Sequence, residues 1–437
     1  MTVTQRAGQP PNIVLAVGDD HSWHDMGCYG ATVVRTPNID RLAREGMRFE
    51  RAFTSTAMCA PTRSMLYTGL HPARNGAWPN HSHVYPGVRS LPHYLGPLGY
   101  RVALAGKTHI GPAESFPFEY LAGSAEAVGA FLDSAKGRPF CLVYASHNPH
   151  SPWRRGLYDP ARVVLPPYVV DTPELRQAMA DYYFEVTALD EEVGMVMGAI
   201  RARGLEEDTL FIYTSEQGAP FFHGKWTCYD VGLRVGFVAR WPGRIAAGST
   251  SNAMIHYVDV APTFVEVAGG EPIPGLDGRG FLDALLGKTD RHRDVVYGVH
   301  TTRGIIAGSE CYPVRSIRTE THKFIRNLNS TAVFQNTVTE NDLDRHWRSC
   351  VQKAKADPAA ARLVEMYQRR PEEELYDLRV DPWELNNLAP DPAHRELAAS
   401  LRQRLRDWMR EQGDLGIETE RKAFERQPRK ARKRKNR

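Results

Sequence analysis

Four short apolar runs, each followed at once by polar residues, organise the first half of the chain. The first is PNIVLAVG, residues 11–18, and it leads directly into Asp19, Asp20 and His21. Three similar units follow: YRVALAGKTHIG (100–111), RPFCLVYASHNPH (138–150) and DTLFIYTSEQG (208–218). Continuous apolar runs of this length predict strands that are buried on both faces, as in a parallel sheet. Because ligands bind beyond the carboxyl ends of such strands, we expect the functional site at these polar ends.

Helical segments separate the strands. Residues 173–203 begin after Thr172 with a proline, a common helix start, and continue amphipathically to Gly204. Strands that alternate with helices predict an α/β fold, in which helices flank both faces of a large, mostly parallel sheet. We therefore predict a catalytic α/β domain over residues 1–305.

The pattern changes after about residue 310. CYPVRSIRTETHKFIRNLN alternates apolar and polar positions as an antiparallel hairpin does, ELYDLRVDPWELNNLA is rich in turn residues, and residues 393–412 have the pattern of a closing helix. We predict a smaller α+β domain over residues 306–420 that contains an antiparallel sheet.

Composition narrows the class of protein. The chain has 437 residues, of which 42% are hydrophobic and 24% charged, as in globular proteins. No stretch approaches the roughly 18 uninterrupted apolar residues of a membrane span. The first residues lack the features of a secretory signal, so we expect a cytoplasmic protein without membrane association. The six cysteines are widely spaced and form no CxxC pair, which favours reduced thiols.

Positive charge is concentrated at the C-terminus. The net charge is +4, but residues 421–437 hold ten Lys/Arg against one Glu, so the first 420 residues carry −5. We expect a solvated, disordered tail over residues 421–437. Contact of this tail with nucleic acid or another polyanion is the alternative.

One cysteine has a distinctive setting. In MCAPTRSMLYTGLHP, residues 58–72, a proline near the first turn and Gly69 after the last predict a helix that begins near Cys59. The free amides of a helix N-terminus favour an anion, and Arg63 lies one turn further along. The pattern indicates a reactive thiolate or an anion pocket. A buried, inert cysteine is the alternative.

Two strand ends carry oxygen ligands. Asp19 and Asp20 follow one strand, and Glu216 and Gln217 follow another. Hard oxygen ligands select Ca²⁺ or Mg²⁺ over zinc. A turn or a helix cap would equally explain an isolated Asp-Asp pair.

Basic residues also gather near the strand ends. Taken singly, each is explained equally well as a surface charge or a hydrogen-bonded loop residue. His147 and His223 are weaker candidates, whereas Trp23, His24 and His81 are expected to be structural. The main candidates are Lys107 and His109 in AGKTHIG, His150 in SHNPH and Lys225 in FFHGKW.

These motifs together resemble a known family. CAPTR matches the Cys-x-Pro-x-Arg pattern of the type I sulfatases, in the alkaline phosphatase superfamily, and PNIVLAVGDD, GKTHIG, NPH, TSEQG and ELYDLRVDPWELNNLA extend the likeness almost end to end. VRSLPHYLGPLGYR, FEY and PVRSIRTETHKFIRNLN are most similar to the heparan N-sulfatase (sulfamidase) branch. Glu216 and Gln217 depart from the family's Asp followed by Asn or His by one methylene each. This departure leaves the ligand set, and the choice between Ca²⁺ and Mg²⁺, open.

The resemblance implies a chemistry for the site. A formylglycine-generating enzyme would oxidise Cys59 to Cα-formylglycine, whose hydrate attacks sulfur. Arg63 and Lys107 would neutralise the sulfuryl oxygens, His150 or Lys225 would assist the leaving group, and His109 would take the proton whose removal expels sulfate. The implied metal ligands are Asp19, Asp20, Cys59, Glu216 and Gln217, with Ca²⁺ as the expected ion and Mg²⁺ as the alternative.

The resemblance also implies a substrate: a small carbohydrate that carries an O-sulfate or an N-sulfate. His300 and Arg303 in YGVHTTRG are candidate sugar contacts, or equally solvent-facing loop residues. A phosphonate or phosphate ester hydrolase with the same site is an alternative. A non-catalytic, sulfatase-like binding protein whose basic tail recruits a polyanion is another. Assembly into a homo-oligomer is left open.

Overall fold

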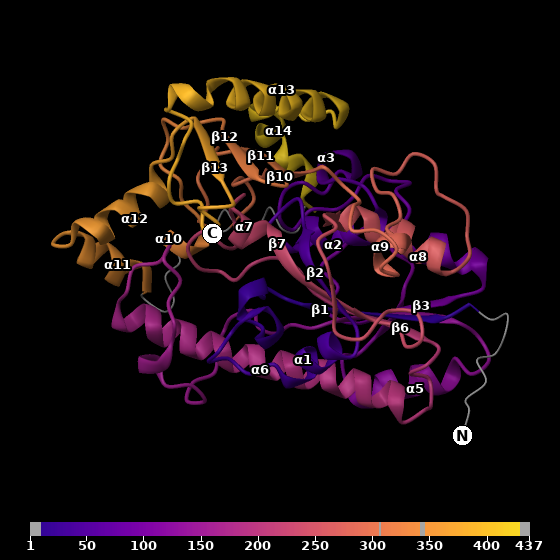
Figure 1. The fold of residues 1–437 in the computed structure, drawn as a ribbon. Helices are drawn as coiled ribbons and strands as arrows, with labels where there is room; N and C mark the ends of the chain where they lie inside the picture. The colour runs from indigo at the N-terminus through magenta and orange to yellow at the C-terminus, as the bar shows by residue number, and fades with distance from the viewer. Residues whose placement is uncertain (1–9, 306, 341–345, 429–437) are drawn as a thin grey trace.

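A computed structural model describes residues 10–305, 307–340 and 346–428, and contains two sheets (Figure 1). The larger sheet of these residues has nine strands. Its order is β4 (Glu119–Leu121), β3 (Arg101–Gly106), β5 (Phe140–Ala145), β1 (Asn12–Gly18), β6 (Thr209–Ser215), β7 (Arg234–Arg240), β2 (Met47–Phe53) and β8 (Ser249–Ser251), with β9 (Ile255–His256) also paired to β2.

The four strands expected from the sequence are confirmed as parallel neighbours in this sheet. β1 pairs in parallel with β5 and β6, and β3 pairs in parallel with β5. Gly18 lies opposite Ser215 in the register of β1 and β6. Asp19 and Glu216, the next residue of each strand, therefore leave the sheet side by side. Among the described strands of this sheet, the antiparallel pairs are those that β7 makes with β6 and with β2.

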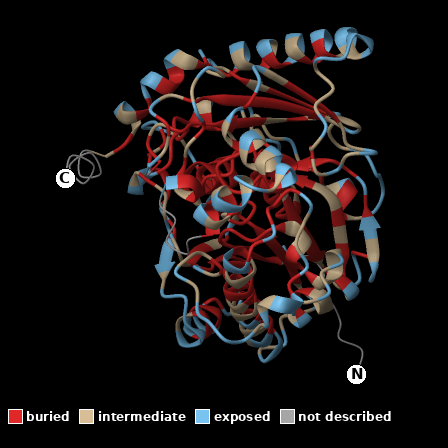
Figure 2. Cartoon of the chain, turned by 90° about the vertical axis from the view of Figure 1, so that its left-hand side faces the viewer, coloured by how far each residue is buried: buried red, intermediate tan, exposed pale blue. Residues whose placement is uncertain are grey.

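Both faces of the larger sheet are covered by helices. Ile13, Leu15 and Val17 pack on one face beneath α2 (Cys59–Thr68) and α8 (Val260–Val267). Val14 and Ala16 pack on the other face against α1 (Pro37–Arg44), α5 (Ala125–Ser134) and α6 (Pro173–Arg201). Figure 1 shows these two layers, and Figure 2 shows the strands buried between them. The predicted long helix is confirmed as α6, whose first turn is capped by Thr172 Oγ1 accepting from the backbone N–H of Leu175 at 3.2 Å.

The smaller sheet is antiparallel throughout. Its four strands run in the order β10 (Val295–His300), β11 (Val314–Thr319), β12 (His322–Asn327) and β13 (Glu373–Asp377), so the predicted hairpin is confirmed as β11 and β12. The predicted closing helix is α13 (Arg395–Glu411), which packs Leu401 and Leu405 on this sheet. The domain division at residue 305 stays a prediction. Strand β10 precedes this division in the chain but belongs to the smaller sheet.

Residues 421–428 differ from the expected free tail. They begin with the last residue of α14 (Ile417–Arg421) and include a 3₁₀ turn at Ala423–Arg426. Arg426 and Gln427 donate hydrogen bonds to backbone carbonyls elsewhere in the chain. Buried carbonyls need donors, which explains why this polar stretch packs rather than extends into solvent. The remainder of the expected tail, residues 429–437, lies outside the described residues.

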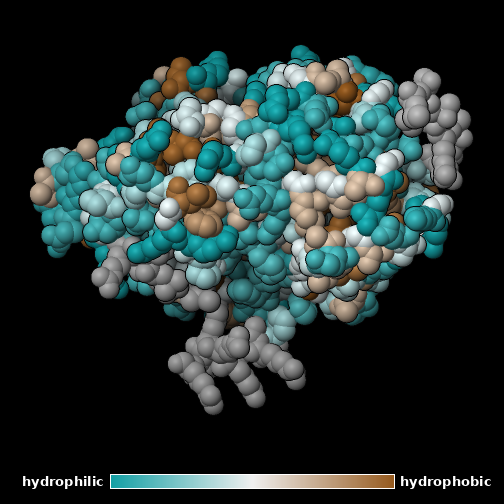
Figure 3. All heavy atoms as spheres, turned by 90° about the horizontal axis from the view of Figure 1, so that it is seen from below, coloured by the Kyte–Doolittle hydropathy of each residue, from teal (hydrophilic) through white to brown (hydrophobic). Residues whose placement is uncertain are grey.

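Within the described part of the chain, no helix is both long enough and apolar enough to cross a membrane. Figure 3 shows a largely hydrophilic face on which apolar side chains form separate small groups.

Candidate active site

Cys59 is the first residue of α2, as the sequence predicts. The preceding Met58 is extended, with φ −144°, and Gly69 ends the helix in the left-handed region at φ 73°. Every residue of α2 is buried, and the thiol of Cys59 donates to Asp19 Oδ1 over 3.8 Å. Burial, reinforced by the negative charge of Glu216, raises the pKa of the Cys59 thiol to about 12. Burial therefore favours the protonated thiol for the unmodified residue, which agrees with the alternative of a buried cysteine.

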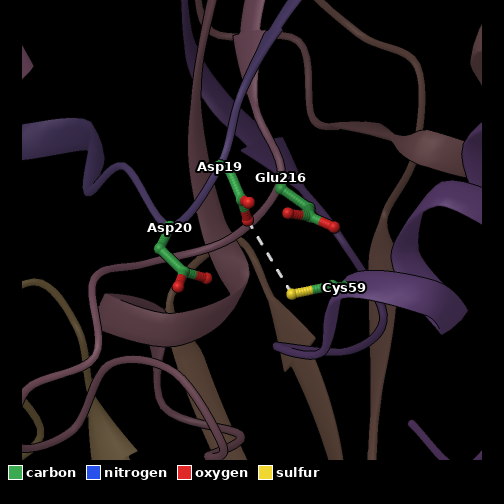
Figure 4. Close-up of side chains that lie close together, drawn as sticks. All are labelled: Asp19, Asp20, Cys59 and Glu216. Carbon is green, nitrogen blue, oxygen red and sulfur yellow. Dashed lines mark hydrogen bonds between the residues drawn. The ribbon is translucent and has the colours of Figure 1, made fainter. Parts of the chain in front are cut away.

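Three carboxylates and this thiol form one buried cluster. Asp19 and Asp20 come from the end of β1, Glu216 follows β6, and their side chains point toward Cys59 (Figure 4). One potential ligand atom from each of the four residues lies within 4.8 Å of the others. Asp20 has φ 66°, a left-handed conformation that costs about 1 kcal/mol or more for a non-glycine residue. The turn after β1 thus directs two consecutive carboxylates into the same space.

The donor set of this cluster fits a hard divalent ion. Gln217 Nε2 donates to Asp20 Oδ1 at 2.5 Å, while the buried Gln217 Oε1 has no hydrogen-bond partner among the described residues. An unpaired buried carbonyl oxygen beside three carboxylates is the arrangement that Ca²⁺ or Mg²⁺ uses. Asp19, Asp20, Glu216 and Gln217 can therefore hold such an ion.

Three cations, of which Arg63 and Lys225 are buried, face the carboxylates. Arg63 donates through Nε to Glu216 Oε1 at 2.8 Å and through Nη2 to Glu216 Oε2 at 3.3 Å. Lys107 Nζ donates to Asp19 Oδ2, and Lys225 Nζ donates to Asp20 Oδ2 at 2.6 Å. Three cations balance three carboxylates, so a bound divalent ion makes the site positive by two charges. Such a site suits an anionic ligand.

The two lysines stay protonated despite their burial. Burial disfavours the charged form of Lys107 and Lys225, but the acidic groups that face them, Asp20 above all for Lys225, raise the pKa of both. Burial likewise raises the pKa of Glu216, against the opposing effect of Arg63. These lysines therefore act as permanent positive charges near neutral pH.

Two predicted histidines lie at the open side of the cluster. His109 Nε2 is hydrogen-bonded to His81 Nδ1 at 2.8 Å. Burial, followed by the positive charge of Lys107 and the neighbouring His81, lowers the pKa of His109 to about 3, so this imidazole is neutral near pH 7. His150 is 40% exposed, and its Nε2 lies 3.8 Å from Asp20 Oδ2.

A cleft of about 700 Å³ opens above this cluster. Arg63 and Glu216 are fully buried beneath its floor. Most of the other predicted catalytic and metal-binding residues reach the cleft wall. Its lining includes Asp19, Asp20, Cys59, Lys107, His109, His147, His150 and Lys225.

The structure does not bring the two candidate sugar contacts to this cleft. His300 is fully buried against the ring of Phe334, at 5.8 Å between centroids. The Arg303 guanidinium lies over the ring of Phe424 at 4.6 Å, and neither residue lines the cleft. His300 ends β10 facing the protein interior, which explains its position.

Other residues that the sequence analysis singled out also lie elsewhere. His223 stacks on Tyr229 at 4.3 Å and is fully buried. Trp23 and His24 line a separate cavity of about 360 Å³ beside Trp383.

Several cleft residues were not expected from the sequence. His81 was expected to be structural, yet it lines the cleft and contacts His109. The pair of histidines in PNHSH, residues 79–83, was the one available signal, because loop residues have no periodicity to place them. The further lining residues are Asn80, Asn148, Ser151, Pro152, Trp153, Pro220, Trp226, Thr337, Val338 and His346.

Comparison with known proteins identifies the family. The sequence profile described as Sulfatase matches residues 11–127 and 120–270, more than half of the chain. An ulvan-active sulfatase of Formosa agariphila is 36% identical over 425 residues, which covers 93% of this chain and 81% of that protein. The chain belongs to the sulfatase family.

This sulfatase also resembles the sulfamidase branch, as its motifs predict. A second profile, described as the C-terminal part of N-sulphoglucosamine sulphohydrolase, matches residues 218–357. The human N-sulphoglucosamine sulphohydrolase is 29% identical over 467 aligned positions, which cover 93% of this chain and 91% of the human protein.

A solved structure confirms the fold of this sulfatase. The neighbour is described as a complex with its substrate D-glucosamine-2-N,6-O-disulfate. It has a TM-score of 0.72 at 22% identity, over 93% of this chain and 99% of that chain. The α/β architecture with an added antiparallel sheet is therefore shared.

Proposed function

We propose that this sulfatase releases sulfate from a small carbohydrate that carries an N-sulfate or an O-sulfate. The proposed nucleophile is Cys59 after oxidation to Cα-formylglycine, and the proposed ion is Ca²⁺, with Mg²⁺ as the alternative. One observation carries the proposal: Cys59 begins α2 on the floor of the cleft, within 3.8 Å of Asp19 and beside a charge-balanced cluster of carboxylates, lysines and Arg63.

The modified residue and the ion each supply one kind of chemistry. A hydrated formylglycine offers two hydroxyl groups, one to attack sulfur and one whose deprotonation expels sulfate. A divalent ion held by Asp19, Asp20, Glu216 and Gln217 would polarise a sulfuryl oxygen and acidify the attacking hydroxyl.

The residues of the chain bind and orient the sulfate group. Lys107 and Lys225 lie on the cleft wall with raised pKa values, so both present ammonium groups to the sulfuryl oxygens. Arg63 acts from below, because its bonds to Glu216 and to the backbone carbonyl of Lys107 hold both in place. Preorganised charges of this kind stabilise a transition state without reorganisation.

Two histidines at the exposed side of the cluster are the proposed proton-transfer residues. His109 is neutral near pH 7 and can accept a proton from a group at position 59. His150 is the most accessible of the candidate acids, and its place beside Asp20 suits it to the departing oxygen or nitrogen.

The substrate class is supported by the relatives and by the cleft. The relatives are named for ulvan and for N-sulphoglucosamine, both sulfated carbohydrates. Trp153 and Trp226 line the cleft and offer the flat apolar surface that a sugar ring needs, next to polar groups. A volume of about 700 Å³ falls within the range of small-ligand sites.

Maturation needs a partner enzyme. Because all of α2 is buried, we propose that a formylglycine-generating enzyme modifies Cys59 before this helix packs. Cytoplasmic localisation and assembly into a homo-oligomer stay predictions.

The experiment that tests the substrate class compares three compounds on protein whose Cys59 peptide has been checked by mass for formylglycine. We expect sulfate release from N-sulfoglucosamine or from glucosamine 6-O-sulfate. Release from the N-sulfate alone would make the enzyme a sulfamidase. If neither sugar releases sulfate and a phenyl phosphonate ester is hydrolysed, the proposal is contradicted and phosphonate hydrolysis takes its place.

Metal removal should abolish sulfate release and lower the melting temperature. Chelation removes from the three carboxylates an ion that binds the folded state. An ion at a free concentration of 100 times its Kd stabilises the folded state by about 2.7 kcal/mol. The test is exhaustive dialysis against a chelator, followed by return of Ca²⁺, Mg²⁺ or Zn²⁺ with activity and melting temperature measured together. Ca²⁺ or Mg²⁺ should restore both. Full activity after chelation, or restoration by Zn²⁺ alone, would contradict the assigned site.

A further inference from the structure

The last described residues of the chain contact two loops, one of which lines the cleft while the other leads into Ile305, which packs behind the cleft wall. In Figure 1 the chain turns back after α13 and passes through α14 toward the α2 side of the larger sheet. There it contacts residues 76–85, which carry Asn80 and His81, and residues 301–304, which follow β10. None of the motifs that carry the sulfatase likeness includes this segment.

Arg426 closes the first loop. Its Nε donates to the carbonyl of Gly76 at 2.9 Å, and its Nη2 donates to the carbonyl of His83 at 2.9 Å. The backbone N–H of His83 donates back to the carbonyl of Arg426 at 3.3 Å, and the guanidinium lies 4.0 Å from the centre of the Tyr85 ring. One side chain therefore bonds to both ends of the loop.

Gln427 joins the two loops. Its Nε2 donates to the carbonyl of Asn80 at 2.7 Å and to the carbonyl of Gly304 at 3.3 Å, and the residue is only 4% exposed. Gly304 has φ 102°, and a Cβ added there would lie 2.8 Å from Gln427 Nε2. The close approach thus requires glycine at position 304.

Both loops reach the reacting centre within one residue of these contacts. Asn80 Oδ1 accepts from the backbone N–H of Ala60 in the first turn of α2, at 3.4 Å, and the adjacent His81 bonds to His109. Ile305, the neighbour of Gly304, packs with Met58 and Trp226, which adjoin Cys59 and Lys225 in the chain. A shift of either loop would therefore move groups that touch the nucleophile and the proton acceptor.

We propose that Gln427 is a positioning residue for sulfate hydrolysis. It touches neither substrate nor metal. It fixes the distance between the loops 76–85 and 301–304, and through Asn80 and His81 it fixes the first turn of α2 and the orientation of His109. This inference rests on the proposed function of the cleft.

The test is Gln427→Met, which preserves side-chain length and removes the donor. We expect kcat to fall about tenfold to a hundredfold, the scale of a misplaced catalytic group, with KM within about twofold. The matched control is Gln412→Met, because Gln412 is also buried and donates to Asp277 at 3.1 Å but does not line the cleft. The control should keep wild-type kcat. An equal loss in both variants would show a general structural effect and would overturn the positioning role.

Hydrogen exchange of the peptide 76–85 gives a readout that does not depend on turnover. We expect faster exchange in Gln427→Met than in wild type, and no change in a β11–β12 peptide. Unchanged exchange in peptide 76–85 would overturn the inference. This holds separately from the proposed function, which is refuted if wild-type protein with formylglycine at position 59 releases no sulfate.

A truncation after Pro428 separates Gln427 from the basic residues that follow it. Because Gln427 and Arg426 are retained, the truncated chain should keep wild-type kcat and exchange. A loss of kcat as large as that in Gln427→Met would assign the effect to residues 429–437 and contradict the positioning role.

Discussion

Cys59→Ser should lose steady-state sulfate release by about a thousandfold or more while the protein keeps its fold. Serine is close to cysteine in size, so the first turn of α2 and its contact with Asp19 can persist. Its single hydroxyl can attack sulfur, but no second hydroxyl remains to expel sulfate, and loss of a catalytic nucleophile costs many orders of magnitude. The measurement is sulfate release per folded molecule.

The control for this variant is Cys311→Ser. Cys311 is partly exposed and does not line the cleft, so its substitution should leave turnover unchanged. Wild-type steady-state turnover by Cys59→Ser would refute the assignment of the nucleophile.

Arg63→Met should lower both stability and activity. Arg63 and Glu216 are fully buried partners at 2.8 Å, so the variant leaves the buried Glu216 carboxylate with the more distant Lys107 Nζ, at 3.9 Å, as its counter-charge. Breaking a buried pair in this way costs about 3–5 kcal/mol of unfolding free energy. Loss of a preorganised charge beneath the sulfate group should also lower kcat by about a hundredfold or more. Urea unfolding and sulfate release measure the two effects.

An ion pair between the partly exposed Arg293 and the buried Asp259 separates these two effects. Arg293 donates through Nε to the buried Asp259 at 2.6 Å, and neither residue lines the cleft. Arg293→Met should therefore destabilise the fold while its folded fraction keeps wild-type kcat. Equal kcat in the folded fractions of Arg63→Met and wild type would show that Arg63 has a structural role alone.

The sequence predicts the sheet and the floor of the site because both depend on local pattern. Apolar runs define β1, β5 and β6, and the residue after each strand lies at the same edge of a parallel sheet. The pairing of Gly18 with Ser215 then brings Asp19 beside Glu216 without further information. The boundaries of α2 follow from one proline and one glycine.

The walls of the cleft depend on contacts that no local pattern encodes. His81 is bonded to a residue 28 positions away, and Arg426 is bonded to a carbonyl 350 positions away. His300 shows the same dependence: it was a candidate sugar contact, but it ends β10 in the interior. Long-range packing decides such positions, and a charge count over residues 421–437 could not show that Arg426 and Gln427 bond to buried carbonyls.

The most direct test of the account is the mass of the peptide that contains position 59 in Cys59→Ser after incubation with substrate. In the expected reaction the serine oxygen bonds to sulfur as the bond from sulfur to the sugar oxygen or nitrogen breaks. The serine proton passes to His109, and the leaving sugar atom takes up a proton from His150. The account predicts that this peptide accumulates one sulfate group per molecule and that sugar is released once. An unmodified peptide in a variant that still releases sulfate would contradict it.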